Sequence, residues 1–231
     1  MKREIVITAD GSSTIHLPDW DEQYHSKHGA IQEAYHVFIK HGLYYFCKPE
    51  HGSIGHQDIS ILEIGFGTGL NAFITLLEAE KLNLIIDYCG VEGYPVSMDE
   101  IKQLNYSKEL KSEKNESLFK KLHEVLWNES HSITSFFKLT KQQKMFHEIN
   151  ETDTFNIIYF DAFGARVQPE LWTETVFENM YKALKSNGIL VTYSAKGSVR
   201  RAMQAVGFKV ERLPGPPGKR EMLRAIKDIK L

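Results

Sequence analysis

The sequence predicts an α/β fold, in which a doubly wound parallel sheet carries a C-terminal antiparallel strand and a small N-terminal β-hairpin extension. Apolar runs typical of buried strands alternate with helical patterns along most of the chain. The run 59–64 also leads through three glycines at alternate positions, Gly65, Gly67 and Gly69, into a helical pattern over about 70–82. Strands joined through crossover helices pair in parallel, which gives the doubly wound arrangement.

The N-terminal part predicts the extension. Residues 3–17 alternate in polarity around Asp10-Gly11, which is typical of a hairpin, and Pro18 ends it. Residues 19–33 are polar and aromatic and predict irregular structure. A helix is expected over about 30–41, with Gly42 as the residue just beyond its end.

The remaining elements follow in alternation. Further strands are expected at 84–91, 132–139, 155–160, 189–194, 208–213 and 221–226, and further helices at 98–105, 117–127, 169–185 and 196–206. The last two strands are expected to close the fold as a hairpin across 214–218, which is rich in proline and glycine.

Composition points to an ordinary globular protein. The chain has 231 residues, of which 42% are hydrophobic and 25% charged, and this length suits one large domain or a domain with a small appendage. It has no run of 18 apolar residues and no N-terminal signal core. Its cysteines, Cys47 and Cys89, form no C-x-x-C pair and fit a reducing compartment. We therefore expect a cytoplasmic protein that uses neither a metal nor a membrane.

Charge is unevenly distributed along the chain. The segment 196–231 has ten Lys or Arg and three acidic residues, a net charge of +7, which leaves −9 for the remainder because the whole chain carries −2. Such asymmetry predicts either a basic surface for an anionic partner or merely the solvated faces of a terminal helix and hairpin.

Two acidic residues and the glycine turn are expected at one edge of the sheet, because ligands of such sheets bind outside the carboxyl ends of the strands. The turn opens a helix, whose free N–H groups and positive dipole end favour an electron-rich ligand. Glu92 ends the second strand, where a carboxylate can accept hydrogen bonds from both ribose hydroxyls of an adenosine ligand. The alternatives are a turn without a ligand and an exposed loop acid.

Asp161 closes the apolar strand 155–160 beside a glycine-containing loop. An acid in that position is a candidate general base or amine ligand, and its alternative role is capping within the loop. Phe163 could flank a reacting group or base, or belong to the core.

The glycine turn resembles motif I of class I S-adenosylmethionine (SAM) methyltransferases. Its spacing is G-x-G-x-G, with Glu63 two residues before the first glycine, whereas dinucleotide-binding folds have G-x-G-x-x-G. The fold expected from this resemblance is the Rossmann-like fold of that class.

The stretch 62–71, Leu-Glu-Ile-Gly-Phe-Gly-Thr-Gly-Leu-Asn, is similar to the motif of the MnmC/MnmD family. These are bacterial tRNA methyltransferases that convert 5-aminomethyl-2-thiouridine at the wobble position to 5-methylaminomethyl-2-thiouridine. Other matches follow in the family order over about residues 20–225. They are Tyr24-His25-Ser26 with Gly29, Glu33 and Val37-Phe38; Glu92-Gly93-Tyr94-Pro95; Phe160-Asp161-Ala162-Phe163 with Pro169-Glu170-Leu171-Trp172; and Ser194-Ala195, Val199-Arg200-Arg201, Gly207-Phe208 and Lys219-Arg220-Glu221-Met222-Leu223.

The resemblance implies a division of roles. Residues 59–231 would form the SAM-dependent domain, and residues 1–58 an extension that covers the cofactor. Asp161 would be the catalytic residue. The residues expected to bind SAM are Glu63, Gly65, Phe66, Gly67, Gly69, Asn71, Glu92 and Tyr24. The residues expected to bind the tRNA substrate are Phe163, which would flank the reacting group or base, and Arg200, Arg201, Lys219 and Arg220. These four belong to the basic C-terminal segment, which would contact phosphates.

Two departures from the family pattern stand out. An acid usually follows the third strand, where an adenine contact is expected, but residues 137–142 read Phe-Lys-Leu-Thr-Lys-Gln, so that contact stays unassigned. The fused members also carry an FAD-dependent oxidase domain, which is not expected in this chain. Methylation alone is therefore expected.

Two other functions remain open at this point. One is a small-molecule amine transferase of the same fold, resembling the polyamine aminopropyltransferases, which also place acidic and aromatic residues around an amine. The other is a module that binds SAM or RNA without catalysis. The basic C-terminal segment favours RNA over a small amine, and the presence of Asp161 with all three glycines argues against a non-catalytic module.

Overall fold

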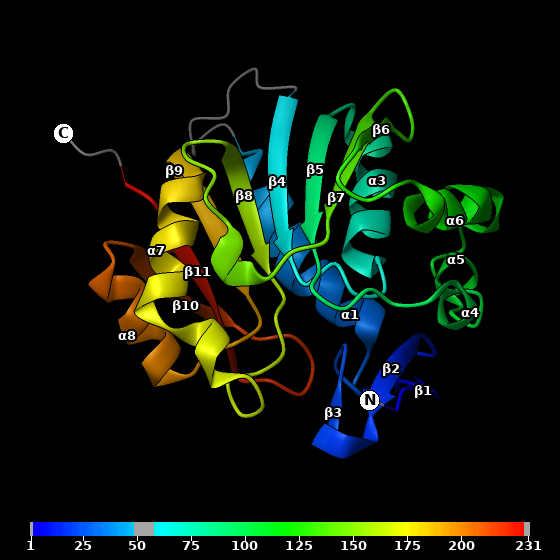
Figure 1. The fold of residues 1–231 in the computed structure, drawn as a ribbon, viewed down its shortest axis with the longest axis horizontal. Coiled ribbons are helices and arrows are strands. Elements are labelled where there is room, and N and C mark those ends of the chain that lie inside the picture. Colours follow the sequence, from blue (N-terminus) through cyan, green and yellow to red (C-terminus); the bar gives the residue numbers. More distant parts are fainter. Residues whose placement is uncertain (1, 49–57, 229–231) are drawn as a thin grey trace.

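The structure is a computed structural model that describes residues 2–48 and 58–228. In this part of the chain an eight-stranded sheet has helices on both faces, and a separate three-stranded sheet lies below the carboxyl ends of the central strands in Figure 1. The predicted α/β fold with a small N-terminal β extension is confirmed.

The large sheet has the strand order β10-β11-β9-β8-β4-β5-β7-β6. Its five strands from β9 to β7 are parallel, and antiparallel strands complete both edges. The C-terminal hairpin β10–β11 is thus confirmed. The strands are β4 (Asp58–Ile64), β5 (Ile85–Val91), β6 (Ser130–Ser132), β7 (Phe137–Gln142), β8 (Phe155–Phe160), β9 (Leu184–Thr192), β10 (Lys209–Pro214) and β11 (Glu221–Ile226).

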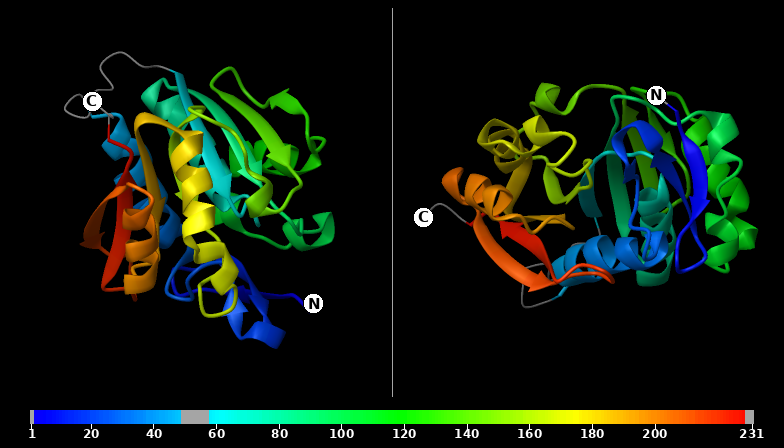
Figure 2. Two further views of the ribbon diagram at one scale, coloured as in Figure 1. Left: turned by 60° about the vertical axis from the view of Figure 1, so that its left-hand side comes forward. Right: turned by 90° about the horizontal axis from the view of Figure 1, so that it is seen from below.

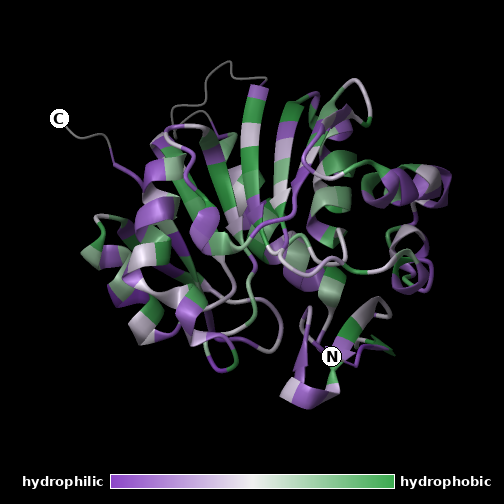
Figure 3. Cartoon of the chain, in the orientation of Figure 1, coloured by the Kyte–Doolittle hydropathy of each residue, from purple (hydrophilic) through white to green (hydrophobic). Residues whose placement is uncertain are grey.

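Alternating strand residues build a hydrophobic core on each face of this sheet. In β4, Ile61 belongs to one core and Leu62 to the other. Figure 3 shows the hydrophobic residues of the central strands between the helical layers. The first core is covered by α1 (Ala30–Ala34), η2 (Tyr35–Leu43), α2 (Tyr44–Phe46), α3 (Leu70–Leu82), α4 (Met98–Ile101), α5 (Tyr106–Glu109) and α6 (Glu116–Glu124), and the second by α7 (Glu174–Ala183) and α8 (Gly197–Ala205).

The small sheet contains the expected N-terminal hairpin. β1 (Glu4–Ile7) and β2 (Ser13–Leu17) pair antiparallel. A short 3₁₀ turn, η1 (Pro18–Trp20), and strand β3 (Glu22–Gln23) follow, where the sequence predicts irregular structure. Figure 2 shows this blue segment from below, in front of the strand ends.

The prediction that Gly42 follows the end of a helix is wrong. The helix continues through the π-helical segment η2 and ends at Phe46 in α2. Gly42 is needed there for packing, because a Cβ atom would lie 3.2 Å from both the Tyr159 ring and the Val191 side chain. A small residue therefore lets this helix approach strands β8 and β9.

Four other predicted elements differ from the structure, one of them the strand expected at 189–194, which runs from Leu184 to Thr192 as β9. The strand expected at 132–139 is instead the end of β6, a bend and β7. The helix expected at 98–105 begins with a capping box, in which Ser97 and Glu100 satisfy each other's backbone N–H groups. It ends at Ile101. The helix expected at 169–185 is divided into η6 (Pro169–Trp172) and α7, because Thr173 is extended.

No helix within residues 2–48 and 58–228 is both long and apolar enough to cross a bilayer. Cys47 and Cys89 are free thiols, and Cys89 is buried. Across the same residues, no group of three or more His, Cys, Asp or Glu side chains is placed to hold a metal ion.

Candidate active site

A cavity of about 1430 Å³ opens at the carboxyl ends of the parallel strands. Its walls come from segments that are far apart in the sequence: the glycine turn, the Glu92 and Asp161 loops, the N-terminal extension and the tip of the β10–β11 hairpin. Pockets for one small molecule are typically about 300–1,000 Å³, so this cavity has room for a cofactor and a reacting group together.

Gly65 brings the glycine turn against the end of β8. Its φ is +89°, and a Cβ atom there would lie 2.7 Å from the Asp161 carbonyl oxygen. The Asp161 N–H in turn donates to the Ile64 carbonyl at 2.9 Å. Only glycine combines this left-handed conformation with so close a contact. The turn and Asp161 are therefore fixed relative to each other by the backbone.

Glu92 is held from two sides by the backbone. Its Oε2 accepts from the Gly67 N–H at 3.0 Å, and its Oε1 accepts from the Tyr94 N–H at 2.9 Å. A carboxylate has about four acceptor positions, so lone pairs remain for a ligand in the cavity. Glu92 lies on the cavity wall.

Asn71 connects two carboxyl groups beneath the turn. Its Nδ2 donates to Asp161 Oδ2 and to Glu63 Oε1, both at 2.9 Å. Glu63 is only 1% exposed and lies outside the cavity wall, and it reaches the wall through its hydrogen bond with Asn71. Burial raises the pKa of Glu63 well above its ordinary value.

Asp161 faces the cavity with a perturbed acidity. Burial and the negative charge of Glu33 raise its pKa to about 7, against the opposing effects of the Asn71 hydrogen bond and the Lys219 charge. A carboxyl group with such a pKa is partly protonated near neutral pH, which suits proton transfer.

The other glycine-turn residues differ in their exposure to the cavity. Phe66 lines it and packs on the His123 ring at a centroid distance of 5.6 Å. Gly69 lies outside the wall, where a Cβ atom would come within 2.7 Å of His123 Nε2. Gly69 therefore allows α6 to approach, rather than touching a ligand directly.

Aromatic residues from both halves of the chain form one wall. The Tyr24 and Trp20 rings meet the Phe163 ring edge to face, at centroid distances of 5.0 Å and 5.8 Å. Trp172 Nε1 fixes the Phe163 backbone by donating to its carbonyl at 2.8 Å. Burial raises the pKa of Tyr24 to about 12, so its hydroxyl stays neutral. Tyr24 and Phe163 thus lie on the wall, as expected.

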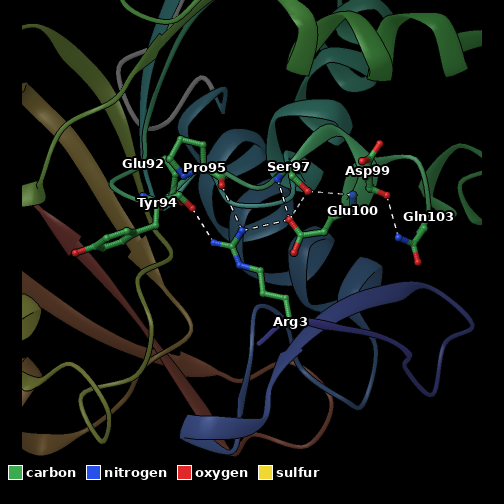
Figure 4. A network of polar contacts seen from close by, with 8 residues as sticks. All are labelled: Arg3, Glu92, Tyr94, Pro95, Ser97, Asp99, Glu100 and Gln103. Carbon is green, nitrogen blue, oxygen red and sulfur yellow. Dashed lines mark hydrogen bonds and ion pairs between the residues drawn. The ribbon is translucent and has the colours of Figure 1, made fainter. Parts of the chain in front are cut away.

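Arg3 anchors the extension to the loop after Glu92 (Figure 4). Its guanidinium donates to the carbonyls of Tyr94 at 2.9 Å and Pro95 at 3.3 Å, and pairs with Glu100 at 3.3 Å. The same guanidinium lies 5.8 Å from the centre of the Tyr24 ring. Arg3 therefore holds together two sides of the cavity.

The four basic residues expected to bind tRNA fall into two groups. Arg200 and Arg201 lie on α8 and Arg220 follows the hairpin tip, all outside the cavity wall. None of these three forms an ion pair within the described part of the chain. Lys219 instead enters the cavity and pairs with Glu33.

Several cavity residues, among them Glu33, Tyr193 and Tyr94, are not among the candidates expected from the sequence. Glu33 and Tyr193 contact Lys219, and Tyr94 projects from the rim with 64% of its surface exposed. Glu33 and Tyr94 belong to segments that resemble family motifs, which is the signal that could have found them. Tyr193 follows a strand and carries no such signal.

Two curated proteins named tRNA 5-methylaminomethyl-2-thiouridine biosynthesis bifunctional protein MnmC are similar to this chain. The one from Cupriavidus metallidurans is 29% identical over 235 residues, covering 95% of this chain and 33% of the relative. The one from Leptospira interrogans is 30% identical over 224 residues, with coverages of 88% and 32%. The chain thus spans about a third of the length of these relatives, and the expected resemblance to MnmC is confirmed.

Two solved structures place the fold. The crystal structure of MNMC2 from Aquifex aeolicus has a TM-score of 0.76 and 26% identity, covering 97% of this chain and 69% of that one. Spermidine synthase from Thermotoga maritima has a TM-score of 0.53 over 100% of this chain and 73% of that one. Its identity is 13%, so this likeness shows the fold alone.

A family profile described as S-adenosyl-L-methionine-dependent methyltransferase matches residues 113–228, half of the chain. The matched part includes strand β8, Asp161 and the hairpin that carries Lys219. The chain therefore belongs to the S-adenosyl-L-methionine-dependent methyltransferase family.

Proposed function

We propose that this chain methylates the amine of 5-aminomethyl-2-thiouridine at the wobble position of tRNA, giving 5-methylaminomethyl-2-thiouridine. The relatives are named for the biosynthesis of that nucleoside. The observation that carries the proposal is the position of the Asp161 carboxyl group, which shares one cavity with the glycine turn. A carboxyl group beside the methyl donor can orient an amine acceptor or accept its proton.

SAM, the cofactor of the family, fits the turn and Glu92. The turn exposes bare backbone toward the cavity at Gly65 and Gly67, and Glu92 has lone pairs left for ribose hydroxyls. We assign Phe66 and Tyr24 to the walls around the cofactor, and Glu63, Gly69 and Asn71 to its support. Bound there, SAM supplies an electrophilic methyl group on a sulfonium.

The adenine contact, for which the sequence offers no acid, is assigned to the loop after β7. Gln143 and Met145 line the cavity directly beyond that strand. The Gln143 side-chain amide has a donor and an acceptor, which are the groups that the edge of an adenine requires. In this proposal an amide takes the place of the usual acid.

Asp161 prepares the substrate amine. An alkylammonium has no lone pair, so it must lose a proton before nitrogen can attack a methyl group. Asp161 can accept that proton or hold the amine with its lone pair aligned, and alignment supplies much of the rate in such a transfer. Asn71 orients the Asp161 carboxyl group by donating to Oδ2, and lone pairs remain on this group for the amine.

The tRNA contacts follow from exposure and charge. Tyr94 offers an exposed ring on which an unstacked base can lie, and Phe163 also lines the cavity. Arg200, Arg201 and Arg220 supply charges for phosphates. These features favour an RNA substrate over a small polyamine.

We further propose that residues 1–58 act as a cover and residues 59–231 as the catalytic domain. The proposed boundary adjoins residues 49–57, which lie outside the described part. We assign no metal to the reaction, and the free thiols suit the cytoplasm.

The proposal is tested with purified protein, SAM and tRNA that carries the 5-aminomethyl-2-thiouridine precursor. Nucleoside mass spectrometry is expected to show conversion of the precursor to its methylamino form. Protein that binds SAM but leaves the nucleoside unchanged would contradict the proposed function.

A further inference from the structure

Lys219, Glu33 and Tyr193 form a cluster in the cavity that the roles above do not use. Lys219 Nζ is in hydrogen-bond contact with Glu33 Oε1, and lies 3.7 Å from the centre of the Tyr193 ring. The two charged residues are 186 positions apart in the chain. The contact therefore joins the N-terminal extension to the tip of the C-terminal hairpin.

Glu33 is the fixed member of this ion pair. It is 5% exposed, and its second oxygen accepts from the Ser26 N–H at 2.8 Å. A carboxylate so deeply buried needs a cationic partner. Lys219 is the movable member, because its side chain is 32% exposed and stands on a flexible aliphatic stem at a loop.

The pair lies next to the catalytic carboxyl group. The Tyr193 hydroxyl donates at 2.8 Å to the carbonyl of Ala162, the residue after Asp161. The Glu33 and Lys219 charges both act on Asp161, in opposite directions. All four side chains line one cavity, so the Glu33–Lys219 pair, the Tyr193 ring and the Asp161 carboxyl group face the same space.

The terminal group of Lys219 has the chemistry of the substrate. It is a methylene carrying a primary ammonium, as is a protonated 5-aminomethyl group. A carboxylate beside an aromatic face is suited to such a cation, through a charge-assisted hydrogen bond and a cation–π contact. Lys219 therefore occupies a seat whose properties match the incoming amine.

We propose that Glu33 and Tyr193 form the initial binding seat for the substrate's primary ammonium, and that Lys219 fills this seat until the substrate displaces it. The inference rests on the function proposed above. After displacement, the Lys219 ammonium swings toward the cavity mouth, where tRNA phosphates compensate its charge. The substrate amine then lies within the same cavity as Asp161.

Two other roles of the pair predict different results. If it only ties the extension to the hairpin, removal of either charge weakens substrate binding in the same direction. If Lys219 only binds phosphate, loss of its charge weakens the binding of all tRNAs equally. If Lys219 instead fills the amine seat until the substrate arrives, loss of the Lys219 charge strengthens recognition of the amine. Loss of the Glu33 charge then weakens it.

The test compares the affinity of two tRNAs in the absence of SAM, by fluorescence anisotropy. They differ only in the 5-aminomethyl group on a wobble 2-thiouridine, so phosphate contacts cancel in the ratio of their Kd values. The wild type is expected to prefer the amine-bearing tRNA. Glu33→Gln is expected to reduce this Kd ratio by about tenfold, or to a value of one, as for loss of one charge-assisted hydrogen bond. Lys219→Met is expected to increase the ratio.

Lys227→Met is the matched control, because Lys227 lies beyond the other end of β11 and pairs with Asp153. It is expected to leave the preference unchanged. The double variant Glu33→Gln/Lys219→Met removes both charges of the pair and leaves neither unpaired. It is therefore expected to fold even if one of the single variants is destabilised. It is expected to show no preference for the amine, and melting curves verify the fold of every variant.

Unchanged preference in Glu33→Gln, a reduced preference in Lys219→Met, or a retained preference in the folded double variant would each overturn the inference. Methylation of the same amine-bearing tRNA by the wild type is measured in parallel. Its absence overturns the proposed function and this inference with it. Methylation with an unaltered preference in the variants overturns the inference alone.

Discussion

At the scale of single residues, Asp161 combines reactivity with an environment that disfavours its charge. Burial at the end of β8 removes the carboxyl group from water, and Glu33 adds a like charge. Asn71 acts against both effects by donating to Oδ2. The balance keeps the group able to exchange a proton at physiological pH.

A carboxyl carbon that titrates near pH 7 is therefore expected in the free protein. ¹³C NMR of carboxyl-labelled protein measures it, and Asp161→Asn identifies it by its disappearance. Because this folded-state pKa lies above the ordinary value, the ionised form becomes dominant only as pH rises through about 7. Addition of SAM is expected to lower this pKa, because a nearby positive charge favours the carboxylate. Ordinary titration near pH 4 would contradict the assignment.

Asn71→Ala tests the support of this group. The Asn71 amide stabilises the ionised form of Asp161, so its removal is expected to raise the pKa of Asp161 further and to move the acid limb of the pH–rate profile upward. At pH 7 turnover falls, and it recovers in part at higher pH. Loss of activity that does not vary with pH would instead assign Asn71 a role in folding or cofactor binding.

The site residues that the sequence predicts are those whose position in the chain determines where they lie in the fold. Glu92 and Asp161 follow strands of a parallel sheet, so topology alone brings them to one edge. Glu33 and Tyr193 have no such rule, because their proximity depends on how the extension folds back onto the hairpin. Lys219 was selected for its charge, but a count of charges does not show that its ammonium points inward.

At the scale of elements, local signals determined which segments become strands and helices, while tertiary contacts decided where they end. Strand β4 and helix α3 match the prediction within a residue, since apolar run, glycine turn and helical pattern agree. Gly42 has the composition of a helix end, but its contact with Tyr159 and Val191 makes it an interior residue. Packing against β8 and β9 is not visible in local sequence.

The Arg3 anchor tests how the extension contributes to the site. Arg3→Met removes the contacts to Tyr94, Pro95 and Glu100 but keeps an aliphatic stem (Figure 4). It is expected to weaken SAM binding by about tenfold or less, as for the loss of partly exposed charge-assisted hydrogen bonds, and calorimetry measures this. Lys2→Met is the control, because the ion pair that Lys2 forms among the described residues is with Glu4 in β1. If both variants changed the affinity for SAM equally, the Arg3 contacts would have no specific role in cofactor binding.

At the scale of the whole molecule, both parts that close the cavity lie outside the parallel sheet. The N-terminal extension and the C-terminal hairpin meet at Glu33 and Lys219, over the strand ends that hold Glu92 and Asp161 (Figure 2). The basic C-terminal segment continues on the outside through α8. In the proposed function, the cofactor site lies at the strand ends, the amine site beside Asp161 and the phosphate contacts on the outer surface.

The outer basic residues are expected to govern the salt dependence of tRNA binding. Neutralising Arg200, Arg201 and Arg220 with glutamine is expected to weaken tRNA binding and to reduce the slope of log K against log salt, by about 0.7–0.9 for each phosphate that is no longer neutralised. Lys108, Lys114 and Lys120, exposed on and between helices α5 and α6, form a control set of equal charge. An equal change of slope in both sets would place the tRNA surface elsewhere.

The most direct test of the whole account is a single-turnover reaction with SAM labelled by a trideuteromethyl group. With the wild type, the label is expected on the amine of wobble 5-aminomethyl-2-thiouridine. With Asp161→Asn, no label is expected there, although this variant still binds SAM. Label found elsewhere on the tRNA, or transferred equally by the Asp161 variant, would contradict the account.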